Sequence, residues 1–249
     1  MIKIAALLLV ALAPLVPLAA VAAEEPQARL DWEHWQAGNS LADLSSLQRG
    51  ARNFMNYCNG CHALKYERYQ RMADDLKIPD NVLAQDLVAP GGNSLDYITT
   101  PMPPADAVNW FGKVPPDLSL ITRSKGPDYV YRFLKTFYAD PASPTGTDNL
   151  AYPSAAMPAV LSELSGVNDA VFTTTKEGKQ FDHFVTAVPG SLTAAQYDQF
   201  VRDTVNFLDY VGEPTQLDRH FIGIWVVLFL LLLTCLSYLL KKEYWKDVH

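Results

Sequence analysis

Hydrophobic residues are concentrated at both ends of the chain, and the longer uninterrupted run lies near the C-terminus. Residues 221–240 hold twenty positions without a charge, the length that a helix needs to span a bilayer. No face of this segment is polar, which disfavours the alternative of a buried helix in a soluble domain. Lys241 and Lys242 follow directly, so the pattern predicts a single membrane span with a cytoplasmic C-terminus.

The N-terminal apolar run has a different character. Lys3 precedes apolar residues 4–20, and small residues at 21–23 lead to Glu24, which is typical of a secretory signal peptide cleaved after Ala23. An uncleaved N-terminal anchor is the alternative. The two ends predict a bacterial inner-membrane protein with a signal peptide (1–23), a periplasmic domain (24–220), a transmembrane helix (221–240) and a cytoplasmic tail (241–249).

Apolar residues at helical spacing predict the first helix of the exported domain. Ser45 and Gln48 have the spacing of a capping box, and the helix continues into Cys58. Gly50 and Phe54 share one face of this helix with Cys58. A glycine on that face would permit close approach of another helix.

Further patterns predict a mainly α domain with long loops. Helical spacing recurs over residues 66–76, 128–138 and 193–211, the last opened by a Thr193–Gln196 capping box and stopped by Gly212. Residues 171–175 and 180–186 predict a small β-hairpin. Residues 77–127 and 139–160 predict loops, and such long irregular segments need something rigid to organise them.

The sequence Cys58-Asn-Gly-Cys61-His62 is the C-x-x-C-H attachment signature of one c-type haem. Two thiols one helical turn apart can add to the porphyrin vinyl groups, and the histidine that follows binds the iron. The alternatives are a redox pair, a zinc half-site or chance. Zinc would need a second ligand pair, but Cys235 is the one other cysteine and lies within the apolar span. Export favours haem, since bacteria attach haem covalently outside the cytoplasm.

Apart from Met1, four methionines are candidates for the second axial ligand of the iron. Met55 shares the helix of the cysteines, and Met72 lies in the next predicted helix. Met102 and Met157 each precede a proline in a loop, the usual setting of a thioether ligand. Chain order favours Met157, because small c-type domains place this ligand in the loop before the final helix. A thioether keeps the iron six-coordinate, which suits electron transfer and not oxygen or peroxide chemistry.

The charge of the exported segment is acidic. Residues 24–220 carry sixteen Lys and Arg against twenty-five Asp and Glu, a net charge of −9. This balance disfavours nucleic acid as a partner and suits a basic protein. Simple solubility is the alternative explanation.

These motifs together resemble the cytochrome c1 family, the haem subunits of the quinol:cytochrome c oxidoreductase (bc1) complex. The similarity covers nearly all of the exported domain and the tail. It rests on CNGCH followed by KYERY at 65–69, PPDLS at 115–119 followed by DYV at 128–130, a methionine loop at 152–158, and the span followed by KKEYW at 241–245.

The resemblance implies a class I cytochrome c fold in which Met157 is the distal ligand. It also implies that a carbonyl near Pro116 accepts the ring N–H of His62 and fixes the ring orientation. Basic residues after PPDLS approach a haem propionate in the family, which places Arg123 or Lys125 in the haem environment.

The implied function is an electron relay from the Rieske iron–sulfur protein to cytochrome c. The subunit would sit beside cytochrome b in a dimeric complex and would make no bond itself, so it is part of an enzyme only through the reductase. One rival is a membrane-anchored cytochrome c that acts alone or in a terminal oxidase. Another is a haem-based sensor, which would need an open iron site and an output domain.

Overall fold

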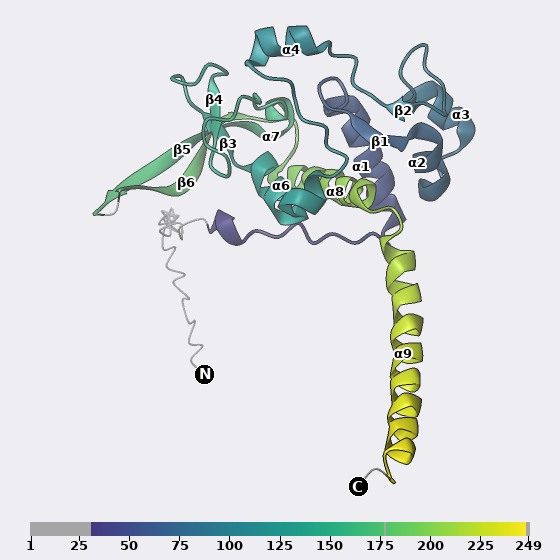
Figure 1. The fold of residues 1–249 in the computed structure, drawn as a ribbon. Helices are drawn as coiled ribbons and strands as arrows, with labels where there is room; N and C mark the ends of the chain where they lie inside the picture. The colour runs from purple at the N-terminus through teal and green to yellow at the C-terminus, as the bar shows by residue number, and fades with distance from the viewer. Residues whose placement is uncertain (1–30, 177, 248–249) are drawn as a thin grey trace, which may run out of the picture.

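The computed structural model describes residues 31–176 and 178–247, so the signal peptide expected at 1–23 lies outside the described residues. Within them, a helical body carries three two-stranded antiparallel sheets, and one long helix leaves the body at its C-terminal end (Figure 1). The prediction of a mainly α fold with a small hairpin and a long apolar C-terminal helix is confirmed.

Two helices far apart in sequence form the centre of the body. α1 (Leu44–Tyr57) packs on α8 (Ala194–Gly212), and the rings of Phe54 and Phe207 lie 5.9 Å apart. A Cβ on Gly50 would lie 2.1 Å from the backbone oxygen of Asp203 and 2.6 Å from Phe207 Cβ. The close helix approach predicted at Gly50 is therefore confirmed.

The start of α1 differs from the prediction. Asp43 is the N-cap, and its carboxylate accepts the N–H of Ser46 at 3.0 Å. Gln48 makes no capping box with Ser45, because its amide donates to the carbonyl of Leu76 at 2.8 Å. The predicted capping box at Ser45 is wrong, since a long-range contact uses the Gln48 side chain.

The segment after the cysteines begins as a strand. β1 (Leu64–Arg68) pairs with β2 (Tyr97–Ile98), and α2 (Tyr69–Leu76) follows. The predicted helix over 66–76 is thus three residues too long at its start, because pairing of Leu64 with Ile98 holds the chain extended. α2 ends at Lys77, which adopts the left-handed conformation with φ of 56°.

Residues 77–127, predicted as loop, contain several short elements. These are α3 (Asp80–Val82), a π-helical turn (Leu83–Leu87), β2, α4 (Pro104–Phe111) and α5 (Ile121–Lys125). α4 has Pro104 in its first turn and ends at Gly112, which has φ of 73°. Such short helices give no sustained hydrophobic period, and the loop prediction is wrong there.

The next helix is shorter than predicted. α6 (Pro127–Lys135) gives way to β3 (Phe137–Ala139), which pairs with β4 (Thr147–Asn149). Thr136 ends the helix by donating its hydroxyl to the carbonyl of Arg132 at 2.8 Å. The loop predicted over 139–160 therefore holds one strand.

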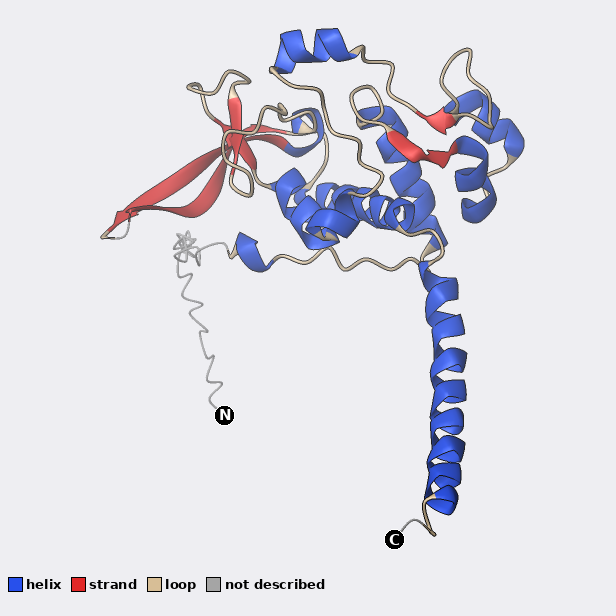
Figure 2. Cartoon of the chain, in the orientation of Figure 1, coloured by secondary structure: helices blue, strands red, loops and turns tan. Residues whose placement is uncertain are grey.

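The predicted hairpin is confirmed and is longer than expected. β5 (Gly166–Thr175) follows the short helix α7 (Ser162–Ser165) and pairs with β6 (Gly178–Pro189). Figure 2 shows this hairpin projecting from the helical body. The capping box of Thr193 and Gln196 at the start of α8 is also confirmed.

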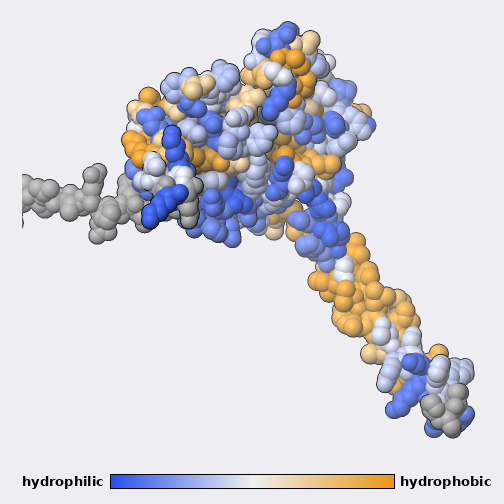
Figure 3. Space-filling model, turned by 60° about the vertical axis from the view of Figure 1, so that its left-hand side comes forward, coloured by the Kyte–Doolittle hydropathy of each residue, from blue (hydrophilic) through white to orange (hydrophobic). Residues whose placement is uncertain are grey.

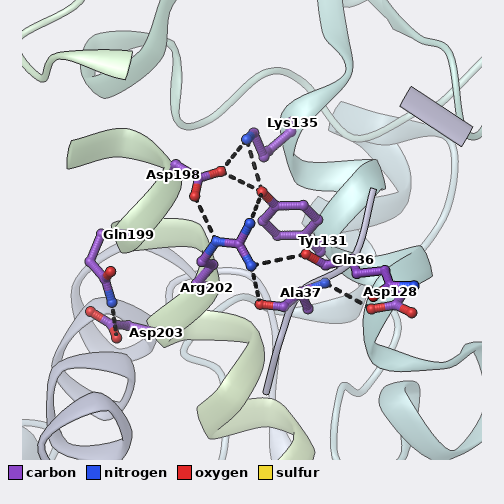
Figure 4. Close-up of polar contacts among 9 residues, drawn as sticks. All are labelled: Gln36, Ala37, Asp128, Tyr131, Lys135, Asp198, Gln199, Arg202 and Asp203. Atoms are coloured by element: carbon purple, nitrogen blue, oxygen red, sulfur yellow. Dashed lines mark hydrogen bonds and ion pairs between the residues drawn. The ribbon is translucent and has the colours of Figure 1, made fainter. Parts of the chain in front are cut away.

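The N-terminal segment, which includes a 3-10 turn (Trp32–His34), is held against α6 and α8 by a polar network (Figure 4). Asp198 accepts hydrogen bonds from Lys135, Tyr131 and Arg202, and Arg202 also donates to the carbonyl of Ala37. Burial acts to raise the pKa of Asp198, but these hydrogen bonds lower it to about 2. The carboxylate therefore stays ionised and orients Arg202, which donates to the segment.

The last helix, α9 (Gln216–Tyr244), contains the predicted span of residues 221–240. It is the one helix among the described residues that is long and apolar enough to cross a membrane. Its side chains are exposed over the whole span, and Figure 3 shows an apolar band between the polar domain and the polar tip. An uncovered apolar helix of this length fits a membrane anchor.

Candidate functional site

A cavity of about 610 Å³, its open mouth included, lies where the end of α1 meets the segment after α4 and the loop before α7. Its lining is mostly apolar and consists of Tyr57, Cys58, Cys61, His62, Phe111, Lys113, Pro115, Pro116, Ala156, Met157, Pro158 and Val160.

The end of α1 brings both cysteines and the histidine to one wall of this cavity. The N–H of Cys58 donates to the carbonyl of Phe54 at 2.9 Å, so the helical hydrogen bonding extends to the first cysteine. The N–H groups of Cys61 and His62 then donate to the carbonyl of Cys58 at 3.0 and 2.8 Å. The chain makes one more turn here, and all three side chains line the same space.

The two thiols are poorly suited to the rival chemistries. Burial, with a smaller effect from Cys61, raises the pKa of Cys58 to about 12, and burial raises the pKa of Cys61 as well. Redox and zinc cysteines act as thiolates, which this apolar wall disfavours. No group of three or more His, Cys, Asp and Glu side chains suited to a metal ion occurs in the described part of the chain. Uncharged thioethers fit the wall better.

His62 is held by a hydrogen bond that its ring donates to the opposite segment. Its Nδ1 lies 2.7 Å from the carbonyl oxygen of Pro116, which can only accept. The proton is therefore on Nδ1, and Nε2 is left free as a ligand atom. Burial lowers the pKa of His62, although Pro116 and Asp117 act in the opposite direction. The ring is thus neutral, as metal coordination requires.

Of the methionines that the sequence offers, Met157 lines the cavity together with His62. Met72 is fully buried in the main core, and Met55 is partly buried against that core. Met102 lies in the turn after β2, where its N–H donates to the Thr100 hydroxyl at 3.2 Å, and it is not among the lining residues. The geometry thus gives His62 one candidate thioether partner.

Arg123 and Lys125 lie elsewhere. The Arg123 guanidinium pairs with Glu213 at the end of α8, and Glu213 also accepts from Arg219 of α9. The Lys125 ammonium lies 5.8 Å from the centre of the Tyr129 ring. Neither basic residue lines the cavity, so their place beside a haem propionate stays a prediction.

Four lining residues lie outside the motifs of the sequence analysis, and one of them is Val160, just after the methionine loop. Tyr57 directly precedes Cys58, and its ring packs edge-on against Phe200 with centroids 5.2 Å apart. Phe111 and Lys113 come from the end of α4 and from the segment just before Pro115. In the sequence these residues lie close to the C-x-x-C-H motif, the PPDLS segment or the methionine loop, which was the one indication of a role. Only the tertiary structure shows that they share one cavity.

Comparison with known proteins extends the similarity to cytochrome c1 beyond the motifs that line the cavity. Residues 32–248 match the model of the cytochrome C1 family. A cytochrome c1 of Allochromatium vinosum is 48% identical over 188 residues, which cover 74% of this chain and 77% of the relative. The ammonia monooxygenase gamma subunit of Nitrosomonas europaea is 40% identical over 70% of this chain and 72% of its own length.

A third relative is a longer protein. The cytochrome b/c1 of Bradyrhizobium diazoefficiens is 31% identical over 71% of this chain, and the match covers 27% of that relative.

Family members carry one covalently bound haem c and serve as electron-transfer subunits of a respiratory oxidoreductase complex. The residues of the cavity fit this group: two thiols one turn apart, an imidazole with its Nδ1 proton already accepted, a thioether and an apolar lining. On the family match over residues 32–248 and on this donor set, the chain belongs to the cytochrome c1 family.

Proposed function

We propose that this protein relays single electrons from a Rieske iron–sulfur protein to a cytochrome c within a quinol–cytochrome c reductase (bc1) complex. The observation that carries the proposal is the cavity that brings Cys58, Cys61, His62 and Met157 together in a domain with one membrane helix. Membership of the cytochrome c1 family supports it.

Each residue of the set has a separate task. Cys58 and Cys61 would hold the haem by thioethers, and His62 and Met157, which line the same cavity, would be the two ligands of its iron. The haem, when bound, supplies an iron that changes its charge by one electron. The Pro116 carbonyl keeps the imidazole oriented, so the ring need not reorganise when charge arrives. With His62 and Met157 both bound to the iron, the site would have no place for a substrate.

The partners follow from the family and from the charge. The Bradyrhizobium diazoefficiens relative is named cytochrome b/c1, which supports association with a cytochrome b. The net charge of −9 over residues 24–220 would steer a basic acceptor such as cytochrome c to the domain. In this arrangement the domain lies in the periplasm of a bacterium, α9 anchors it, and the complex is a dimer.

Purification in mild detergent, followed by identification of the bound subunits, tests the proposal. We expect cytochrome b and a Rieske protein to remain with the full-length chain, and we expect quinol to reduce its haem in that preparation. A chain that purifies alone, or with terminal-oxidase subunits, would refute the relay. Recovery with monooxygenase subunits would instead favour the role that the name of the Nitrosomonas europaea relative indicates.

A further inference from the structure

We infer that Asp148 and Asn149, the last two residues of β4, are positioning residues that set the course of the loop carrying Met157. The inference rests on the proposed role of Met157 as an axial ligand. Neither side chain lines the cavity, and both act through the backbone of residues 151–155.

Asn149 ties the start of the loop to α6. Its side chain is fully buried, and its Nδ2 donates to the carbonyl of Phe133 at 2.7 Å. Its Oδ1 accepts the N–H groups of Ala151 and Tyr152 at 2.9 and 3.0 Å. A buried amide with these contacts has a fixed position, and the loop backbone is held to it.

Asp148 holds the next turn of the same loop. Its Oδ1 accepts the N–H groups of Ser154 and Ala155 at 2.7 and 3.4 Å. Its Oδ2 is 3.3 Å from the Tyr138 hydroxyl on the paired strand β3, which donates to it. The carboxylate thus connects a strand to the turn that precedes Met157.

Ser154 shows that the turn needs this support. Its φ is +61°, a left-handed conformation that is sterically unfavourable for a residue with a side chain. The shortest hydrogen bond from the loop to Asp148 comes from the N–H of this residue. A charge-assisted hydrogen bond of this length can offset the conformational cost.

The loop backbone depends on these two side chains throughout. Between residues 151 and 155, Pro153 has no N–H, and the other four N–H groups all donate to Asp148 or Asn149. Met157 follows Ala155 by two residues, and the Ala155 side chain is buried. The position of the Met157 sulfur is therefore set largely from the end of β4.

The test uses full-length, haem-loaded protein in detergent and reads out the ligand, not the activity. In Asp148→Ala we expect loss of the near-infrared sulfur-to-iron band, a lower reduction potential, and carbon monoxide binding to the reduced protein. Haem content by pyridine haemochrome should not fall, because the cysteines lie on another wall. Asp148→Asn should keep the band, since an amide oxygen can still accept from Ser154.

Asp140→Ala is the matched control. Asp140 lies in the turn between β3 and β4, and its carboxylate accepts the N–H of Ala142 at 3.0 Å. The variant removes the same charge from the same hairpin but removes no hydrogen bond to the methionine loop, so the band should persist. An unchanged band in haem-loaded Asp148→Ala would overturn the inference.

Two further variants separate the possible outcomes. If Asp148→Ala does not load haem, the double variant Asp148→Ala/Ser154→Gly should load haem and regain the band, because glycine adopts φ of +61° without strain. Failure of both to load would assign Asp148 to folding alone and reject the positioning role. Retention of the band in Met157→Leu would reject the ligand assignment of the proposed function itself.

Discussion

Glu67 is a carboxyl group that is only 4% exposed, at the junction of β1 and α8. Its Oε1 lies 3.4 Å from the Tyr210 hydroxyl, and that hydroxyl donates to Asp75 at 2.8 Å. The hydroxyl proton is directed mainly at Asp75, so its longer contact with Glu67 does little to stabilise an ionised Glu67 carboxyl. Burial raises the pKa of Glu67 to about 7, although the nearby Arg71 acts to lower it.

The contribution of Glu67 to stability should therefore fall as the pH rises from about 4.5 to 7. In this window the folded state binds a proton at Glu67 that the unfolded state has lost, so the free energy of unfolding falls by roughly 3 kcal/mol. Glu67→Gln should flatten this dependence, because its amide cannot ionise. Denaturant unfolding at several pH values measures the pH dependence of the free energy of unfolding. Asp74→Asn, at an exposed position of α2, is the control. A slope in Glu67→Gln equal to that of the wild type would contradict the assignment.

The choice between two methionines is also a matter of single side chains. We expect Met157→Leu to remove the near-infrared sulfur-to-iron band and to lower the reduction potential, because a thioether favours the reduced iron. Met102→Leu should leave both unchanged, since Met102 does not line the cavity. Optical spectra and a redox titration of the two variants measure the difference. The opposite pattern would assign the ligand to Met102.

The packing of α1 on α8 depends on one missing side chain. In Gly50→Ala the new Cβ would meet the backbone of Asp203 at 2.1 Å, and a backbone cannot move aside as a flexible side chain can. We expect a loss of about 2–3 kcal/mol, even after the gain in helix propensity. Thermal unfolding in detergent tests this, with Asn56→Ala on the exposed side of α1 as the control. Equal stability of the two variants would show that the helices can separate without cost.

How far each element was predictable depended on the range of its contacts. α8, the β5–β6 hairpin and α9 were predicted because caps, alternation and uninterrupted hydrophobicity lie in adjacent residues. The start of α1 and the strand β1 were not, because Gln48 bonds to Leu76 and Leu64 pairs with Ile98. Contacts with residues distant in the sequence override the local preference for helix or strand, and these contacts cannot be identified from a single sequence.

The placement of the whole molecule in a membrane is open to a direct test. Because Lys241, Lys242 and Lys246 follow the span, we expect the C-terminus to be cytoplasmic. A green fluorescent protein fused after residue 249 should fluoresce, whereas alkaline phosphatase there should be inactive. Alkaline phosphatase fused after residue 212, before α9, is the control and should be active. An active phosphatase at residue 249 would mean that α9 does not cross the membrane.

The sequence by itself determined the family, with its one covalently bound haem c, and an apolar helix long enough to span a membrane. Each of these depends on residues that are contiguous or on a length of apolar chain, because covalent bonding and bilayer crossing are local requirements. Only the tertiary structure decided that Met157 lines the cavity of His62, that Pro116 accepts the ring proton, and that Asp148 and Asn149 hold the methionine loop. It also decided that Glu67 is buried beside Tyr210. These features arise from contacts between distant segments, and such contacts form only when the chain folds.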